Sequence, residues 1–534
     1  MASTTIVREA DLELAAQPQW RPKYNPWLIA LVVTLASFME VLDTSIANVA
    51  LPHIAGGMSA TEDEATWVLT SYLVSNAIIL PLSGWLSFLL GRKRFYMLCV
   101  LLFTVSSFLC GIAPTLGALV FFRILQGVGG GGLQPSEQAI LADTFLPQQR
   151  GMAFAIYGIA VVTAPAIGPT LGGWITDNFT WRWIFFINIP VGIASLLLSN
   201  FLLEDPPYLI KERMQRIKSK LRVDYWGIIF IAIGLGFLQI VLDKGEREDW
   251  WASGFIRTCA ILSIAGLIIA VYWELKQKNP VVDLSLLKDR NFGIAGLLML
   301  MVGVVLLGST VLIPQYMQLI MGYSATQAGA VLSPGAILII LLLPMVGFLL
   351  SKVESRWMIG VGLFITSTAL IHMTNFDVFI DFKYAMLARC WQAAGFAFLF
   401  VPINTAAYAF VPRNKNNAAS GLINLARNVG GSVGISLVTT ILTRRSQFHQ
   451  ARLTEQASAL NPNFQHALNS AAQVFQGGGE ATGPYALLLR NLQRQAANLA
   501  YIDCFWLLGV VFGALIPLVF LMKRVKPGTA GPAH

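Results

Sequence analysis

The chain has 534 residues, of which 55% are hydrophobic and only 12% are charged. Because a soluble protein carries about 25% charged residues, this composition excludes a chain of ordinary soluble domains. The net charge of +9 would by itself fit a nucleic-acid partner, but the positions of the basic residues account for it in another way. The five cysteines form no Cys-x-x-Cys pair, so neither a zinc site nor a disulfide framework is predicted.

Apolar runs of about eighteen residues or more, each long enough to cross a bilayer as a helix, follow one another along the chain. They predict an all-α polytopic membrane protein with fourteen transmembrane helices in a 6+2+6 arrangement. The polar segment 1–26 lacks the basic start and short apolar core of a signal peptide, so we expect it to be a soluble tail. The expected domains are this tail, a six-helix bundle at 27–203, a linker with two inserted helices at 204–290, a six-helix bundle at 291–522 and a second tail at 523–534. The predicted spans lie near 27–51, 66–88, 95–113, 116–142, 151–175, 183–203, 225–243, 254–274, 291–314, 325–350, 357–374, 384–411, 417–442 and 497–522.

The distribution of basic residues predicts the orientation of these helices. Most of the 37 lysines and arginines fall in the two tails and in the loops that follow even-numbered helices, as in Arg92, Lys93 and Arg94. The short loops on the opposite side are neutral or acidic, as at 62–64. Because basic loops stay on the cytoplasmic side, both termini are predicted to be cytoplasmic. The basic excess therefore reflects topology, and no nucleic-acid partner is expected.

Residues 445–495 form the one large extramembrane segment that the apolar pattern predicts. The segment is rich in Ala, Gln and Asn on both sides of a break at Gly477, Gly478 and Gly479, and this composition suits helices that extend the flanking spans. Two interpretations stay open. It is either a flexible solvated loop or a docking surface for a partner on the outer side of the membrane.

Four short patterns recur in the same order roughly 260 residues apart, as expected of a transporter built from two copies of one membrane unit. Such transporters bind their substrate between the two copies. Apolar helices resemble one another, but ordered Pro, Gly and Arg positions at a near-constant offset argue against a chance likeness. The pairs are Val49–Pro52 with Val311–Pro314, Leu80–Leu86 with Leu343–Leu349, Arg123–Gln126 with Arg389–Gln392, and Pro147–Arg150 with Pro412–Arg413.

Three ionisable residues inside the first and fourth spans are predicted to carry proton coupling, since such groups are costly in a membrane and usually functional. Glu40 and Asp43 lie three residues apart and share a helix face, where one of two nearby carboxylates tends to hold a proton. Arg123 needs a partner, and a carboxylate of the first helix is the natural candidate. A structural cap or pair is the alternative for each of them. Asp43 aligns with the apolar stretch around Val305, so the proton chemistry is expected in the first copy, with the second mainly supplying a cavity wall.

The fifth span combines two prolines with glycines at a spacing of four, which predicts a bent, closely packed helix that acts as a gate or hinge. General membrane packing is the alternative. The residues concerned are Pro165, Gly168, Pro169, Gly172 and Gly173. The Gly run at 129–132 lies in mid-span, and the chain contains no Gly-Lys dipeptide, so no Walker A motif is present. We therefore expect no cofactor, and transport driven by the proton gradient.

Side chains that suit a hydrophobic substrate cavity are scattered over both copies. For any one of them, core packing or a position that faces lipid is the alternative. No catalytic or metal-binding cluster is recognised, so we expect a secondary active transporter and not an enzyme. The candidate cavity residues are Met39, Asn48, Tyr72, Gln126, Tyr157, Gln315, Tyr316, Phe396, Asn404 and Arg427.

The motifs together resemble the major facilitator superfamily, in its fourteen-helix drug:proton antiporter branch of the EmrB/QacA type. The run Leu42–Pro52 matches the first-helix motif of that branch, and Arg123 with Gly127 matches the fourth-helix motif, whose Arg the family ties to proton coupling. The fifth-span residues match the antiporter motif. The loop motif after the second helix is matched by Gly84, Leu86, Gly91, Arg92 and Lys93, but Phe88 stands where the family has Asp, which puts the usual charge latch in doubt.

This resemblance implies a major facilitator fold and proton-coupled export of hydrophobic drugs or toxic compounds across a bacterial inner membrane by alternating access. It also implies a tripartite pump with a periplasmic membrane-fusion adaptor of the EmrA type and an outer-membrane channel of the TolC type, although QacA-like relatives act alone. A dedicated exporter or importer of one metabolite, siderophore or fatty acid is an alternative. A membrane sensor or scaffold that has lost transport is another.

Overall fold

The computed structural model describes residues 20, 22–146, 148–218, 224–277, 280–455, 457–458, 460–474 and 483–525. Within these ranges the chain forms helices joined by short loops, and no strand is among them. Thirteen of the described helices are long and apolar enough to cross a membrane, or up to fourteen when a bent pair is taken as one span. The predicted all-α polytopic membrane fold is therefore confirmed.

Each apolar run folds as a helix because only a helix satisfies its own backbone polar groups in lipid. Local signals mark several of the ends: Asn25 accepts a hydrogen bond from Trp27 N, and Gly91 (φ +92°) makes the tight turn between two helices. The helices of the first bundle are α2 (Pro26–Gly57), α4 (Trp67–Leu90), α5 (Arg92–Gly111), α6 (Leu116–Thr144), α7 (Arg150–Asn178) and α9 (Asn188–Leu202), with short α3 (Glu62–Ala65) and α8 (Trp183–Phe186).

The remaining helices divide into a pair between the bundles and a second bundle. The second bundle contains six long helices that pack on one another. The inserted pair is α11 (Tyr225–Lys244) and α12 (Gly254–Lys276), preceded by α10 (Pro207–Lys218), and the second bundle is α13 (Arg290–Leu319), α14 (Ala325–Leu349), α15 (Ser355–Met373), α16 (Phe382–Ala407), α17 (Asn416–Glu455) and α19 (Gly483–Ala514), with short α18 (Pro462–Val474) and α20 (Ile516–Val519). The predicted domain boundaries themselves stay predictions.

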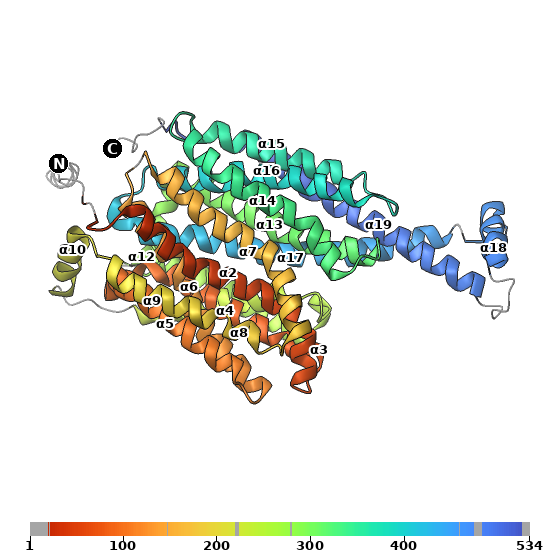
Figure 1. Ribbon diagram of the computed structural model, residues 1–534, viewed down its shortest axis with the longest axis horizontal. Coiled ribbons are helices and arrows are strands. Elements are labelled where there is room, and N and C mark those ends of the chain that lie inside the picture. The colour runs from red at the N-terminus through yellow and green to blue at the C-terminus, as the bar shows by residue number, and fades with distance from the viewer. Residues whose placement is uncertain are drawn as a thin grey trace.

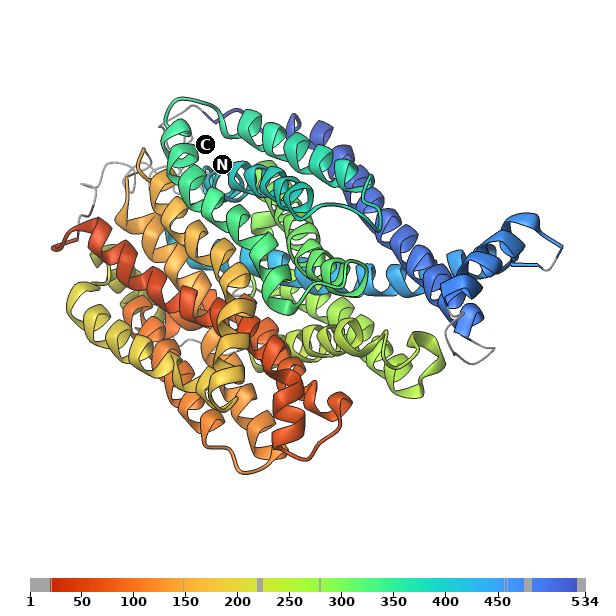
Figure 2. The same cartoon turned by 45° about the vertical axis from the view of Figure 1, so that its right-hand side comes forward.

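The long helices run side by side along one direction, so the molecule has two distinct ends (Figure 1). α2 begins and α20 ends at one of them, which we call the terminus end. Asn291, at the start of α13, lies there too, because its Nδ2 donates to the carbonyl oxygen of Lys523 at 3.2 Å. The other end, where α18 projects, is called the α18 end (Figures 1 and 2).

Large apolar side chains cover the outside of both bundles and of the inserted pair. In water such a surface would be an extended apolar patch, whereas in a bilayer it faces lipid tails. The most exposed examples on membrane helices include Phe201 at 68%, Ile261 at 68% and Leu341 at 68%. This belt agrees with a multi-pass membrane protein.

The inserted helix α11 touches both bundles. It packs against α4, where Thr70 Oγ1 donates to Asp243 Oδ2, and Lys244 Nζ donates to the carbonyl oxygen of Asp63 in α3 at 3.2 Å. It also meets α17, where Gln239 Nε2 donates to Ser432 Oγ at 2.8 Å. The inserted pair is therefore fixed to both bundles and is not a separate appendage.

Two helices continue past the bundles at the α18 end, where α17 and α19 extend side by side toward α18 (Figure 1). Asp503 Oδ2 on α19 accepts from Arg445 Nε at 2.5 Å and lies 2.7 Å from His449 Nε2, both on α17. The expectation that residues within 445–495 extend the flanking helices is confirmed for 445–455 and 483–495. The Gly477–Gly479 break lies outside the described residues.

Candidate functional site

Asp43, on α2, is the centre of a first buried group of polar side chains, called the Asp43 cluster. Its Oδ2 accepts a hydrogen bond from Arg123 Nη1 at 2.6 Å, and the two form an ion pair. Its Oδ1 accepts from Asn188 Nδ2 at 2.7 Å and from Gln126 Nε2 at 3.1 Å. Both of these amides also donate to Ser107 Oγ. Helices α2, α5, α6 and α9 therefore each contribute one or more side chains around this carboxylate.

The guanidinium of Arg123 is enclosed within the first bundle. Its Nε donates to the carbonyl oxygen of Val68 at 3.0 Å, and its Cζ lies 4.5 Å from the centre of the Tyr72 ring. Arg123 is 0% exposed and Asp43 2%. Because the pair is enclosed, each charge compensates the other, and removing either one would leave a buried charge without a partner. The predicted pairing of Arg123 with a first-helix carboxylate is confirmed, while its role in proton coupling stays a prediction.

Glu40 lies one turn closer to the terminus end and makes a different set of contacts. Its Oε1 accepts from the Tyr72 hydroxyl at 2.9 Å and from Asn76 Nδ2 at 3.2 Å, and its Oε2 accepts from Gln134 Nε2. Tyr72 joins the two sets, because its ring lies against Arg123 while its hydroxyl is bonded to Glu40. Glu40 and Asp43 are thus neighbours on α2 that share no hydrogen-bond partner among the described residues.

Gln134 carries the contacts of Glu40 across to the second bundle. Its Oε1 accepts from Arg427 Nη2, and Arg427 Nη1 donates to the Tyr157 hydroxyl at 3.1 Å. That hydroxyl lies 3.2 Å from Gln134 Oε1 and 3.2 Å from Asn424 Oδ1, and its single proton can serve only one of them at a time. We call this set the inter-bundle network; its members are Glu40, Tyr72, Asn76, Gln134, Tyr157, Asn424 and Arg427.

Gln138 makes a second bridge between the bundles, one turn further along α6. Its Oε1 accepts from Asn424 Nδ2 at 2.8 Å, Ser420 Oγ at 3.0 Å and the Tyr408 hydroxyl at 3.2 Å. Its Nε2 donates to Asn404 Oδ1 at 3.4 Å. The two bundles are therefore held together in their middle by hydrogen bonds among amides, hydroxyl groups and the Arg427 guanidinium.

The structure brings several of the predicted cavity residues to this region and leaves others outside it. Tyr72, Tyr157 and Arg427 belong to the inter-bundle network, Asn404 bonds to Gln138, and Gln126 lies in the Asp43 cluster. The remaining predictions do not join either set.

Those remaining residues lie in other surroundings. Met39 and Phe396 are buried among apolar side chains, and Gln315 is half-buried. Asn48 is exposed, and its Nδ2 donates to the carbonyl oxygen of Thr44 on its own helix at 3.2 Å. Tyr316 lies inside the second bundle, where its hydroxyl is 2.8 Å from Asn498 Oδ1 and its ring packs against Phe376 and Tyr501.

The α7 motif packs directly on α2. α7 bends by 45° between Pro165 and Ile167, as its prolines predict. A Cβ atom on Gly168 would lie 2.2 Å from Ser45 Oγ, and one on Gly172 would lie 3.1 Å from Ile46 Cγ2. Gly173 differs, because a Cβ atom there would meet nothing within 4 Å. Pro165 presents its carbonyl oxygen to Ser45 Oγ at 3.2 Å. The bent, closely packed helix is confirmed, and its role as a gate stays a prediction.

Replacing Gly168 by alanine should push α7 away from α2, because the new methyl group overlaps Ser45. Overpacking of this kind costs roughly 1–3 kcal/mol. We expect a lower thermal unfolding temperature in detergent and slower export. Gly173→Ala is the matched control on the same helix and should leave both unchanged. Equal behaviour of the two variants would contradict the packing described here.

The loop motif after α4 lies where the bundles meet at the terminus end. A Cβ atom on Gly84 would lie 2.8 Å from Cα of Ala418 on α17, so only glycine permits this approach. Arg92 forms a buried ion pair with Asp143, and its Nη1 also donates to the carbonyl oxygen of Ala139 at 3.2 Å. Lys93 donates its backbone N–H to Asp205 Oδ1 at 2.9 Å. All these contacts of Arg92 and Lys93 stay inside the first half of the chain.

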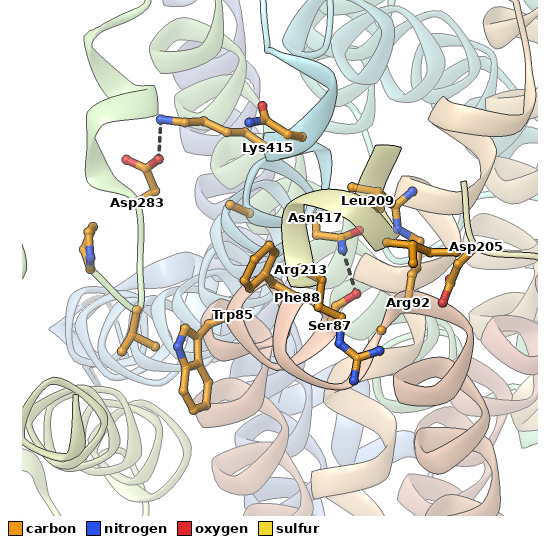
Figure 3. A pocket seen from close by; sticks show the side chains of 17 residues that line it. Trp85, Ser87, Phe88, Arg92, Asp205, Leu209, Arg213, Asp283, Lys415 and Asn417 are labelled. Carbon is orange, nitrogen blue, oxygen red and sulfur yellow. Dashed lines mark hydrogen bonds and ion pairs between the residues drawn. The ribbon is translucent and has the colours of Figure 1, made fainter. Parts of the chain in front are cut away.

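A pocket opens beside this motif, between the α4–α5 turn, α10, the segment before α13 and the start of α17 (Figure 3). Asn417 Nδ2 donates to Ser87 Oγ at 2.6 Å across it, and Lys415 pairs with Asp283 at 2.6 Å. Burial raises the pKa of Asp283, but hydrogen bonds from Lys415 and Ser285 outweigh that effect and hold the pKa below its usual value. At the position of Phe88 the family that the loop motif resembles has an Asp that forms a charged contact between the bundles. Here the neighbouring residue Ser87, which is neutral, makes a contact between the bundles through its hydrogen bond from Asn417.

Every side-chain hydrogen bond that the structure describes between the two bundles lies between their middle and the terminus end. Gly151 and Gly347 also touch there, with a Cβ on Gly151 only 2.9 Å from the carbonyl oxygen of Gly347. Nearer the α18 end, α7 and α14 still meet at Thr170 and Gly329. The two bundles are therefore closed against each other at the terminus end.

Arg389, the counterpart of Arg123 in the second copy, has no matching carboxylate. Its Nη1 donates to Gln392 Oε1 at 2.5 Å, and the described residues place no ion pair on it. This agrees with the alignment of Asp43 to the apolar stretch at Val305, which is buried on α13. The two copies therefore differ in their charge chemistry.

Asn188, Ser107, Gln134 and Gln138 are site residues that the sequence analysis did not select. Each is a buried polar side chain inside a predicted span. An amide or hydroxyl group in such a position needs a partner, which is the signal that a wider search of the spans would have used.

Comparison with known proteins agrees with this fold. The profile of the Major Facilitator Superfamily matches residues 33–435. Two solved structures of low sequence identity share the fold. The proton:xylose symporter XylE has a TM-score of 0.58 and 14% identity, with 95% of this chain and 97% of that chain covered. The human organic anion transporter MFSD10 also has a TM-score of 0.58 and 14% identity, with 94% and 100% covered.

Curated relatives are similar over nearly the whole chain. The multidrug export protein EmrB of Haemophilus influenzae is 37% identical over 500 residues, which cover 93% of this chain and 95% of that protein. EmrB of Escherichia coli K12 is 34% identical over 510 residues, covering 95% and 98%. The fatty acid resistance protein FarB of Neisseria gonorrhoeae is 35% identical over 497 residues, covering 93% and 96%. The chain therefore belongs to the major facilitator superfamily, among its EmrB-type members.

Proposed function

We propose that this secondary transporter exports lipophilic small molecules across a bacterial inner membrane in exchange for protons. One observation carries the proposal: a carboxylate, Asp43, is buried against Arg123 and lies next to a polar network that joins the two bundles. A group whose charge changes on protonation is thereby placed beside the contacts that must break when the bundles rock.

The exchange follows from the electrostatics of the Asp43 cluster. A proton arriving from the α18 end neutralises Asp43, so Arg123 loses its compensating charge and turns to other acceptors. The ring of Tyr72 lies against Arg123 and its hydroxyl holds Glu40, so a movement of Arg123 reaches the inter-bundle network. Protonation thereby changes the relative stability of the two conformations, which is all that coupling requires.

We further propose that the terminus end faces the cytoplasm and that the α18 end faces the periplasm. The basic loops at the terminus end support this orientation. The projecting α17–α19 pair with α18 would then be a docking surface for a periplasmic membrane-fusion adaptor, itself joined to an outer-membrane channel. The similarity to EmrB proteins over nearly the full chain supports this partnership.

Efflux of a panel of lipophilic dyes from cells that express the chain tests the proposed function. We expect dye accumulation to fall on expression and to recover when an uncoupler collapses the proton gradient. The same measurement in proteoliposomes with an imposed pH gradient excludes effects of other pumps. Export that continues unchanged without a gradient would overturn proton coupling.

A further inference from the structure

A stripe of buried polar residues runs along α2 at a spacing of three. The other side chains of α2 are mostly apolar. The members of the stripe, each less than 9% exposed, are Thr34, Ser37, Glu40 and Asp43. Residues three apart lie on one helix face. Because each step of three turns by about 60° around the helix, the stripe winds around α2 from the Asp43 cluster toward the terminus end, with each member adjacent to the next.

Helix α6 faces this stripe with polar groups of its own, at three levels. Arg123 and Gln126 meet Asp43, and Gln134 meets Glu40. At the third level, nearest the terminus end, Glu137 Oε1 accepts a hydrogen bond from Thr34 Oγ1 at 2.5 Å. Three carboxyl groups thus succeed one another along the contact between α2 and α6.

Glu137 is the member of this series that the exchange mechanism above does not use. It is 0% exposed, and its Oε2 has no hydrogen-bond partner among the described residues. Ser37 is close enough to interact with its carboxyl group, although Ser37 Oγ also lacks a partner of ordinary geometry. The titratable groups within electrostatic reach are Glu40 on α2, Tyr96 on α5 and Tyr157 on α7. The structure describes no lysine or arginine against it, so nothing holds it permanently as an anion.

We propose that Glu137 is a proton-relay residue, which receives the coupling proton from Glu40 and passes it to the terminus end. The proposal rests on the proposed function, since it extends the path of the proton beyond Asp43. Ser37 lies on α2 between Glu40 and Thr34, the residue that is bonded to Glu137, and its hydroxyl can take a proton on its oxygen while giving up its own. In each cycle Glu40 receives the proton from Asp43 and loses it to Glu137. Glu137 then returns to the anion by releasing that proton to water when the bundles open at the terminus end.

The alternative is that Glu137 is permanently protonated and has only a structural role. Glutamine has nearly the shape of protonated glutamate, with an NH₂ donor in place of the OH group, but it cannot release or take up a proton. Glu137→Gln therefore separates the two roles. Glu274→Gln is the matched control: Glu274 is also a buried glutamate, 4% exposed, but it lies on the inserted helix α12 and accepts from Val282 N at 3.3 Å.

The measurement is proton release into proteoliposomes that contain a pH-sensitive dye, after addition of a transported lipophilic dye. A positioned proton-transfer group contributes about 10²–10⁴-fold in rate, so Glu137→Gln should slow coupled transport at least tenfold. Exchange of labelled for unlabelled substrate, which needs no net proton movement, should keep its rate, and this shows that the variant folds and binds. Glu137→Asp should restore part of the coupled rate.

Two results would overturn the relay: coupled transport by Glu137→Gln at the rate of the unchanged protein and of Glu274→Gln, or an equal loss of coupled transport and exchange. Neither touches the proposed function, which is tested by the unchanged protein and by Asp43→Asn. If the unchanged protein shows no proton-driven export, the proposed function fails first.

Discussion

Asp43→Asn abolishes proton-driven export while substrate exchange across the membrane continues. Asparagine keeps the shape of the carboxylate and can still accept from Asn188, but it cannot gain or lose a proton. The contribution of a proton-transfer group is about 10²–10⁴-fold, so coupled export should fall at least about a hundredfold. The measurement is uptake of a lipophilic dye into inverted vesicles that are energised by an acid interior.

A second carboxylate variant controls for the loss of a buried or paired acid in general. Asp503→Asn removes an aspartate that pairs with Arg445 at 2.5 Å, on the α17–α19 extension and away from the Asp43 cluster. In vesicles it should transport at the normal rate. Retained coupling in Asp43→Asn would show that another group carries the proton, and Glu40 would be the next to replace.

Arg123→Gln destabilises the protein strongly, and Asp43→Asn in the same molecule restores much of that stability. Arg123 and Asp43 form a pair that is almost fully buried, and removing one member of such a pair costs about 3–5 kcal/mol because it leaves the other charge uncompensated. Removing both leaves two neutral amides and no uncompensated charge. The measurement is the free energy of unfolding in mixed micelles for the two single variants and the double variant.

Arg389→Gln serves as the control in this cycle. Arg389 is buried at the equivalent place of the second copy but has no carboxylate partner among the described residues. Its effect should add to that of Asp43→Asn without interaction. If Arg123→Gln were equally additive with Asp43→Asn, the ion pair described here would not be present in the membrane.

Span positions could be predicted from the sequence because a bilayer leaves a strong composition signal over about twenty residues. The link between Asp43 and Arg123 could be predicted as well, since a buried guanidinium needs an anion and few carboxylates lie inside the spans. The bend of α7 followed from Pro165 in the same way. Each of these features depends on a residue type that raises the free energy of a membrane helix unless a specific partner or a bend compensates for it.

The network around Glu40 could not be predicted in this way. Its contacts join residues 94 positions apart at Glu40 and Gln134, and 293 positions apart at Gln134 and Arg427. They depend on how each helix is rotated about its axis. Membrane helices are apolar on most of their surface, so hydropathy gives little information about rotation. The position of Tyr316 beside Asn498 depends on helix rotation in the same way.

The unbroken length of α17 has a mechanical consequence. It runs as one helix of 40 residues, about 60 Å at the usual rise, from the contacts with the first bundle to the far tip beside α18. Asn424 and Arg427 hold its inner part, so a small tilt there becomes a larger sideways swing at the outer part, as in a lever. A partner protein bound to that tip would be displaced each time the bundles open or close. No additional moving element would be needed between the bundles and the partner.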